Sequence, residues 1–122
     1  MNAKELRVGN LIYNDFGEIQ PVYGVDEKSI LTKVEENGWS ICFKPKTIQL
    51  TEEWLLKFGF LIIEINGKFE ATLPNFRYNI YWNKYTDGFL FCDGETVLIN
   101  FNYVHELQNL VFVLGQRELT VA

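Results

Sequence analysis

Short apolar stretches separated by turn residues recur over most of the chain, which is the pattern of consecutive β-strands. Turn residues separate the first apolar stretches, and Asn14 to Gly17 provides the first hairpin-type turn. We predict strands at residues 11–13, 19–25, 30–34, 39–43 and 47–50, with turns at 26–29 and 36–38. Five short strands at this spacing are typical of a small SH3-like barrel or a bent sheet.

The periodicity changes from strand-like to helical at Thr51. Trp54, Leu55 and Phe58 recur at helical spacing, and Thr51 can cap the N-terminus of a helix at these residues. Gly59 is expected to end the helix in the left-handed conformation. This helix is only about two turns long, so packing rather than intrinsic propensity must stabilise it.

The strand-like pattern returns beyond this helix. The Asn66-Gly67 turn between two apolar stretches is a strong hairpin signal. We predict strands at residues 60–65, 69–73, 76–85, 89–92 and 96–101. A second helix is expected from a cap at Asn100 or Asn102 to Leu114, with Gly115 as its stop. The fold class is therefore α+β and mostly β, in one domain at residues 1–122 with lobes at 1–50 and 51–122.

The predicted strand at residues 76–85 carries the most suggestive side chains. If Phe76, Tyr78, Ile80 and Trp82 face the core, alternate residues share the other face. Tyrosine, arginine and asparagine together are typical of a protein-binding surface, and they can also stack single-stranded bases. An ordinary open sheet face is the alternative. The candidate binding residues on this strand are Arg77, Asn79, Tyr81, Asn83 and Tyr85.

The second helix carries a further stripe opposite its apolar face. His105, Gln108, Asn109 and Phe112 follow helical spacing on that side. We interpret the stripe as either a solvated face or a contact surface. Gln108 or Asn109 could equally tie the helix to neighbouring backbone.

Net charge is −5, which disfavours duplex DNA as a partner because phosphate binding depends on clustered lysine and arginine. The negative charge favours solubility in general, and a more specific interpretation is attraction to a basic protein surface. The longest apolar stretch, Phe58 to Ile63, is far shorter than the about 20 residues that a membrane span needs. The N-terminus also lacks the apolar segment of a secretory signal, so a cytoplasmic location is expected.

Residues that carry catalysis or metal binding are sparse. His105 is the only histidine, whereas a zinc site needs several nitrogen or sulfur ligands and a hydrolytic triad needs three convergent groups. Cys42 and Cys92 lie in apolar, strand-like stretches, so we interpret both as reduced core residues. The glycines occur singly at turns and form no phosphate-binding loop motif. We predict no catalytic residues, no metal and no cofactor.

Two end segments carry a resemblance, Glu5-Leu-Arg-Val-Gly-Asn-Leu-Ile-Tyr13 and Tyr103-Val-His-Glu-Leu-Gln-Asn-Leu-Val-Phe112. With the similar pattern at residues 50–60, they resemble a group of short proteins of Bacteroidetes-type bacteria and their phages and prophages. The YVHELQNL segment is its most specific mark. Small acidic phage proteins are often inhibitors that bind a host defence nuclease, including CRISPR effectors, or that handle its signal molecule. The resemblance therefore implies action by binding.

The first functional hypothesis is therefore a non-enzymatic binding protein whose partner is a host protein or ribonucleoprotein. The most specific version of this hypothesis is that the partner is a CRISPR nuclease. The second is a small-ligand or nucleotide-binding protein with a pocket between the two lobes. Partner identity and oligomeric state do not follow from the sequence.

Overall fold

The computed structural model describes residues 6–25, 30–35 and 38–121, so the predicted turn at 26–29, most of that at 36–38 and Glu5 of the resemblance lie outside them. The chain divides into two compact units. The first comprises Met1–Gln49 and Tyr103–Asn109, and the second comprises Leu50–Asn102 and Leu110–Ala122. The first unit thus ends next to the predicted lobe boundary, but it also takes part of the C-terminal helix.

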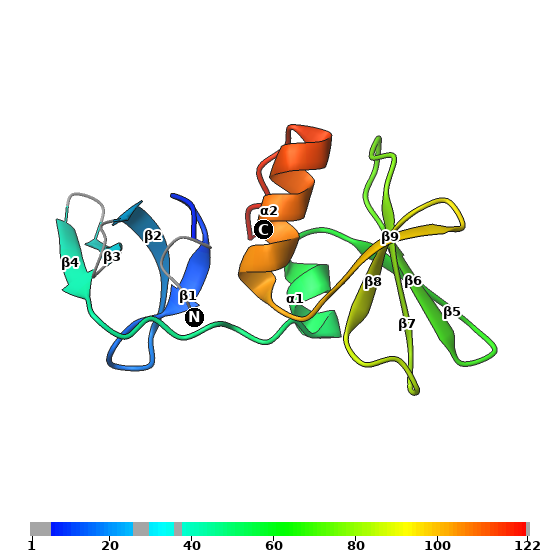
Figure 1. Cartoon of the computed structure of the whole chain (residues 1–122), viewed down its shortest axis with the longest axis horizontal. Coiled ribbons are helices and arrows are strands. Elements are labelled where there is room, and N and C mark those ends of the chain that lie inside the picture. The colour runs from blue at the N-terminus through cyan, green and yellow to red at the C-terminus, as the bar shows by residue number, and fades with distance from the viewer. Residues whose placement is uncertain (1–5, 26–29, 36–37, 122) are drawn as a thin grey trace. The chain divides into compact units, whose positions relative to one another are not determined.

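The described part of the first unit contains an antiparallel sheet in the order β1-β2-β3-β4. Its strands are β1 (Leu11–Tyr13), β2 (Ile19–Val25), β3 (Ile30–Glu35) and β4 (Gly38–Cys42) (Figure 1). Asn14 holds the first turn, because its Oδ1 accepts the N–H groups of Phe16 and Glu18, each at 2.9 Å. Leu6, Ile12, Val22 and Cys42 pack as a buried cluster.

The predicted fifth strand at residues 47–50 is wrong. Lys46 exchanges two backbone hydrogen bonds with Tyr13, at 2.9 and 3.0 Å, and Gln49 forms a single bridge to Tyr103. Isolated bridges of this kind do not extend into a ladder. Of the two predicted alternatives, the described residues therefore form a sheet and not a closed barrel.

The second unit contains a five-stranded antiparallel sheet in sequence order, with β5 at one edge (Figure 1). Its described strands are β5 (Leu61–Ile65), β6 (Lys68–Thr72), β7 (Asn79–Asn83), β8 (Phe89–Asp93) and β9 (Thr96–Phe101). Asn66 and Gly67 join β5 to β6 with positive φ angles of 52° and 78°, as a tight hairpin turn requires. One face of this sheet carries the buried Ala71, Ile80 and Phe91.

Helix α1 (Glu52–Lys57) precedes this sheet and has the predicted caps. The Thr51 hydroxyl accepts the Trp54 N–H at 3.4 Å. At the other end, Gly59 has a φ of 92°, and the N–H of Phe60 reaches back to the carbonyl of Leu55 at 3.0 Å. These bonds satisfy orphan groups at both ends of a short helix.

Helix α2 (Val104–Gly115) begins and ends differently from the prediction. Because the helix begins at Val104, the residue directly before it is Tyr103 and neither predicted asparagine. The N–H of Tyr103 donates to Glu106 Oε1 at 3.1 Å, as in a capping box. Gly115 is still helical, and Gln116 takes the left-handed conformation with a φ of 51°. A Cβ on Gly115 would lie 2.3 Å from Phe76 Cε1. The glycine is therefore required for close packing and not for a turn.

Within the described ranges, none of the helices combines the length and apolar character needed to span a membrane.

Candidate binding surface

Strand β7 positions the side chains that the sequence singled out. It covers Asn79–Asn83 and is shorter than the predicted strand at 76–85. Ile80 is fully buried, and the Trp82 ring stacks on Phe69 with centroids 5.4 Å apart and planes 6° apart. Because strand side chains alternate, Asn79, Tyr81 and Asn83 share the opposite face. The predicted alternation is confirmed for the residues within β7.

The ends of the predicted row lie outside the strand. Arg77 precedes β7 and forms a bidentate ion pair with Asp93, in which its Nε and Nη2 donate at 3.2 and 2.6 Å. Tyr85 is 84% exposed in the following turn. Asn83 Oδ1 accepts the N–H groups of Tyr85 and Thr86 at 2.7 and 3.0 Å, so its side chain shapes that turn. The expectation that all five residues share one strand face is therefore wrong.

Asn79 and Tyr81 of β7 join a compact polar cluster with Glu70 of β6. Asn79 Nδ2 donates to Glu70 Oε2 at 2.7 Å and to the Tyr81 hydroxyl oxygen at 2.9 Å. Tyr81 also hydrogen-bonds Glu70, and this bond, followed by partial burial, raises the pKa of Tyr81 to about 12. A hydrogen bond that the phenol donates to a carboxylate favours the neutral phenol. The three side chains therefore hold one another in fixed positions.

Register brings an apolar row next to this cluster. Ile63 pairs with Glu70, which in turn pairs with Tyr81, so the three side chains lie on the same face. Leu61, Ile63 and Ile65 alternate along β5, and they are 62%, 50% and 66% exposed. We call this side of the second sheet the Tyr81 face, defined by six residues: Leu61, Ile63, Ile65, Glu70, Asn79 and Tyr81.

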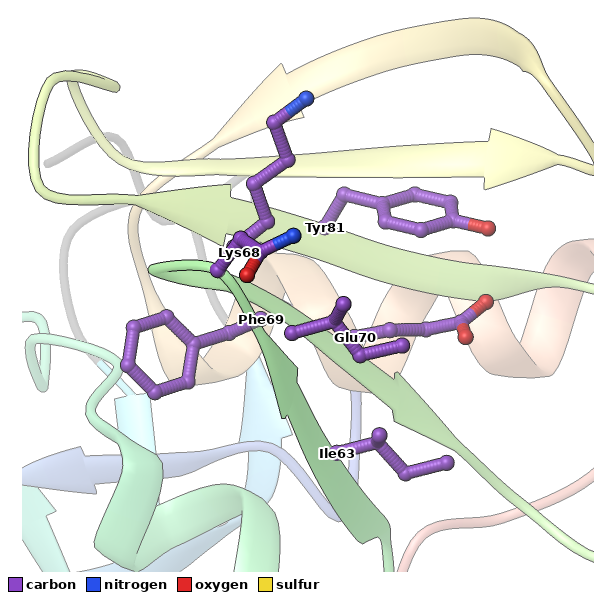
Figure 2. A pocket seen from close by; sticks show the side chains of 7 residues that line it. Ile63, Lys68, Phe69, Glu70 and Tyr81 are labelled. Carbon is purple, nitrogen blue, oxygen red and sulfur yellow. The ribbon is translucent and has the colours of Figure 1, made fainter.

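A pocket of about 320 Å³ opens on the Tyr81 face. Figure 2 shows Glu70 and Tyr81 extending in the same direction, whereas Phe69 points the opposite way. The ammonium of Lys68 lies well away from the Glu70 carboxylate in this view. The pocket lies within the second unit, and its lining is Ile63, Ile65, Asn66, Lys68, Phe69, Glu70 and Tyr81.

Of the residues that line this pocket, Tyr81 alone belongs to the candidate binding residues predicted from the sequence. The missing neighbours come from β5 and β6, and the Asn66-Gly67 turn was the signal that could have located them. A two-residue hairpin loop fixes the pairing of its flanking strands. It places Ile63 opposite Glu70. The further pairing of β6 with β7 has no comparable local signal.

The helix stripe is not a continuous exposed surface. His105 and Gln108 are 2% and 1% exposed. Gln108 Oε1 accepts the Leu11 N–H at 2.9 Å, and its Nε2 donates to the Gly9 carbonyl at 3.2 Å. The expectation that these two residues lie on the surface is wrong. For Gln108 the structure favours the alternative, a tie between the helix and neighbouring backbone.

The other stripe residues divide in the same way. Asn109 Oδ1 accepts from Arg7 Nε at 3.1 Å and from Asn10 Nδ2 at 2.8 Å, so it too has an internal role in the first unit. Phe112 is 42% exposed. His105 stacks on Tyr103 with ring centroids 5.9 Å apart. Of the four stripe residues, Phe112 alone is exposed.

The two thiols are buried and free, as predicted. Burial, and then a hydrogen bond to Asp15, raise the pKa of Cys42 to about 11. Asp15 itself lines a second pocket, of about 300 Å³, in the first unit. Its carboxylate accepts the N–H groups of Phe43 and Lys44 at 3.1 and 2.8 Å. These bonds lower the pKa of Asp15, and the carboxylate is already engaged within the protein.

In the ranges that the structure describes, no three histidine, cysteine or acidic side chains converge on a point where they could hold a metal. The Tyr81 face thus stands as the candidate site on geometry alone. Comparison with known proteins gave no matching family model, curated protein or solved structure.

Proposed function

We propose that this chain is a non-enzymatic binding protein of phage or prophage origin that contacts a protein or ribonucleoprotein in the host cytoplasm. The Tyr81 face is the observation that supports the proposal. It combines three exposed aliphatic side chains with a tyrosine in a rigid polar cluster. Interfaces obtain most of their binding energy from such aromatic anchors surrounded by apolar contacts.

Preorganisation strengthens this argument. Asn79 and Glu70 bond to the Tyr81 hydroxyl, so the ring loses little rotamer freedom when a partner binds. Ordering a side chain at an interface otherwise costs about 0.5 to 1.5 kcal/mol. The exposed aliphatic row on β5 gives the partner apolar area next to this fixed anchor.

The class of partner is inferred from the resemblance and the charge. Short phage-borne proteins that resemble this chain suggest a host defence nuclease, with a CRISPR effector as the narrowest case. A net charge of −5 complements the basic channel by which such an enzyme holds nucleic acid. The proposed action is inhibition by occupation of that surface.

A small-molecule site is the second candidate, because a pocket of about 320 Å³ is at the lower end of the range for ligand sites. Its lining contains one lysine and one glutamate, which is a poor match to the phosphates of a nucleotide. Thermal shift against cyclic and linear nucleotides tests this alternative. A ligand at 100 times its dissociation constant adds about 2.7 kcal/mol to the free energy of unfolding.

The binding proposal is tested by pull-down from a Bacteroidetes-type host, with RNA intact in one sample and digested in another. Wild-type protein is compared with Tyr81→Ala and with Tyr23→Ala, a matched control at a 54% exposed tyrosine of the first unit. We expect a host protein retained by the wild type and by Tyr23→Ala, and lost with Tyr81→Ala. Retention that depends on RNA would identify a ribonucleoprotein.

Affinity measurements with the purified partner then give the size of the loss in binding free energy. Loss of an aromatic anchor costs about 1 to 3 kcal/mol of binding free energy. Loss of the hydrogen bonds that Tyr81 forms with Asn79 and Glu70 is expected to lower the free energy of unfolding by only about 0.5 to 1.5 kcal/mol. Equal binding by Tyr81→Ala and wild type would contradict the proposed surface. A large fall in thermal stability would instead assign Tyr81 to the core.

A further inference from the structure

The carboxylate of Glu70 is a polar group of the pocket that has unused bonding capacity. Its Oε2 accepts from Asn79 at 2.7 Å, and the second interaction is with the Tyr81 hydroxyl. A carboxylate has about four acceptor sites, so these two bonds do not exhaust it. Neither partner carries a charge. The pocket therefore contains a negative charge that is held in position by neutral donors.

No cation neutralises Glu70 among the residues that the structure describes. The nearest candidate by sequence, Lys68, extends away from it (Figure 2). Arg77 is already paired with Asp93 at 2.6 Å. The carboxylate keeps open acceptor sites, so a positive group from outside can form charge-assisted hydrogen bonds with it.

The walls of the pocket match the rest of a long basic side chain. Ile63 and Ile65 supply exposed aliphatic surface beside the carboxylate, and the aromatic ring of Tyr81 lies next to it. Arginine and lysine have an apolar stem and a charged head, and they bury the stem along apolar surface. A guanidinium also forms bidentate bonds with carboxylates and stacks on aromatic rings.

We propose that the pocket on the Tyr81 face accepts an arginine or lysine side chain of the protein partner, with its stem along Ile63 and Ile65 and its charged head at Glu70. This inference rests on the proposed function, since it names the chemistry by which that surface recognises its partner. Net charge of −5 favours the approach of a basic surface.

The direct test is an NMR titration of the full chain with two blocked tripeptides, acetyl-Gly-Arg-Gly-amide and its citrulline counterpart. Citrulline retains the length and hydrogen-bonding shape of arginine but carries no charge. We expect the arginine peptide to shift the methyl signals of Ile63 and Ile65 and to bind at least about tenfold more tightly than the citrulline peptide. Absence of shifts at these methyl groups, or equal binding of both peptides, would overturn the inference.

Charge variants locate the bond. Glu70→Gln keeps an oxygen that can accept from Asn79 but removes the charge, and we expect it to weaken the arginine peptide at least about tenfold. Glu64→Gln is the matched control, because Glu64 is exposed on the opposite face of β5, where it pairs with Phe69. Its binding should equal that of the wild type. If both variants bind the arginine peptide equally weakly, the peptide is attracted by the overall negative charge of the protein and not by a site at Glu70.

The two proposals fail separately. If Tyr81→Ala loses the cellular partner while Glu70→Gln retains it at wild-type affinity, the binding surface stands and the basic side chain is excluded. If the arginine peptide binds at Glu70 but Tyr81→Ala still retains the cellular partner, the pocket stands and the proposed protein interface is wrong.

Discussion

Replacement of Gln108 by alanine separates an internal role from a binding role more sharply than any other single change in helix α2. The side chain is 1% exposed and bonds two backbone groups, the N–H of Leu11 at 2.9 Å and the carbonyl of Gly9 at 3.2 Å. Truncation leaves both backbone groups, which belong to half-buried residues, without this partner. A fully buried unsatisfied group costs about 1 to 3 kcal/mol. Because these two groups are only part-buried, we expect a loss of about 2 to 4 kcal/mol in the free energy of unfolding.

The assay is urea denaturation combined with hydrogen exchange at the Leu11 amide. Gln49→Ala is the matched control, because Gln49 is exposed and its bridge to Tyr103 uses only the backbone; a change within about 0.5 kcal/mol is expected there. Gln108→Ala should accelerate exchange at Leu11, and the control should not. Equal stability of both variants, with Leu11 exchange unchanged, would refute the internal role.

A charged replacement adds a pH dependence to the same test. In Gln108→Glu, a protonated carboxyl can accept from Leu11 and donate to Gly9, whereas an ionised one is buried opposite a carbonyl. Burial raises the folded-state pKa of such a glutamate above its unfolded value. The hydrogen bonds of the protonated carboxyl therefore stabilise the folded state to their full extent at pH values below the unfolded pKa. This stabilisation is lost as pH rises through the folded pKa. Wild-type protein should lack this transition.

Three further predictions follow from the packing and the pKa shifts. Gly115→Ala should lower the free energy of unfolding by about 1 to 3 kcal/mol by overpacking against Phe76, although alanine is the better helix former, and urea denaturation measures it. The pKa of Asp15 is lowered by two backbone N–H groups, so Asp15→Asn should be less stable than the wild type at pH 7. The difference in stability should shrink as pH falls below the unfolded pKa of 3.8 and through the lower folded pKa. Ultraviolet titration should show Tyr81 ionising near pH 12, and Glu70→Gln should move that transition toward 10, the ordinary tyrosine value.

Elements fixed by neighbouring residues could be predicted from the sequence. The caps of α1 lie within the two ends of the helix, and the Asn66-Gly67 turn sets the β5 and β6 hairpin locally. Alternation along β7 identified Ile80 as core and Tyr81 as outward-facing. In each case the deciding interactions join residues close in sequence, where spacing alone carries the information.

Elements fixed by distant residues could not be predicted. The bonds of Gln108 join residues 97 and 99 positions away, so helical spacing showed only that it lies opposite the apolar face. Gly115 was interpreted as a turn residue because nothing in the sequence indicates that Phe76 packs against it. The pocket needs the pairing of β6 with β7, which places Glu70 beside Tyr81 although ten residues separate them in the sequence.

These differences change how a loss of binding should be interpreted. Both candidate surfaces contain polar side chains at regular spacing, but Gln108 uses its amide to hold backbone, whereas Tyr81 is held by its neighbours and presents its ring beside an exposed aliphatic row. A variant at Gln108 that fails to bind does so through unfolding of the first unit. A variant at Tyr81 fails by losing contact. Stability and affinity must therefore be measured on the same variants, because binding data alone would assign both residues to the interface.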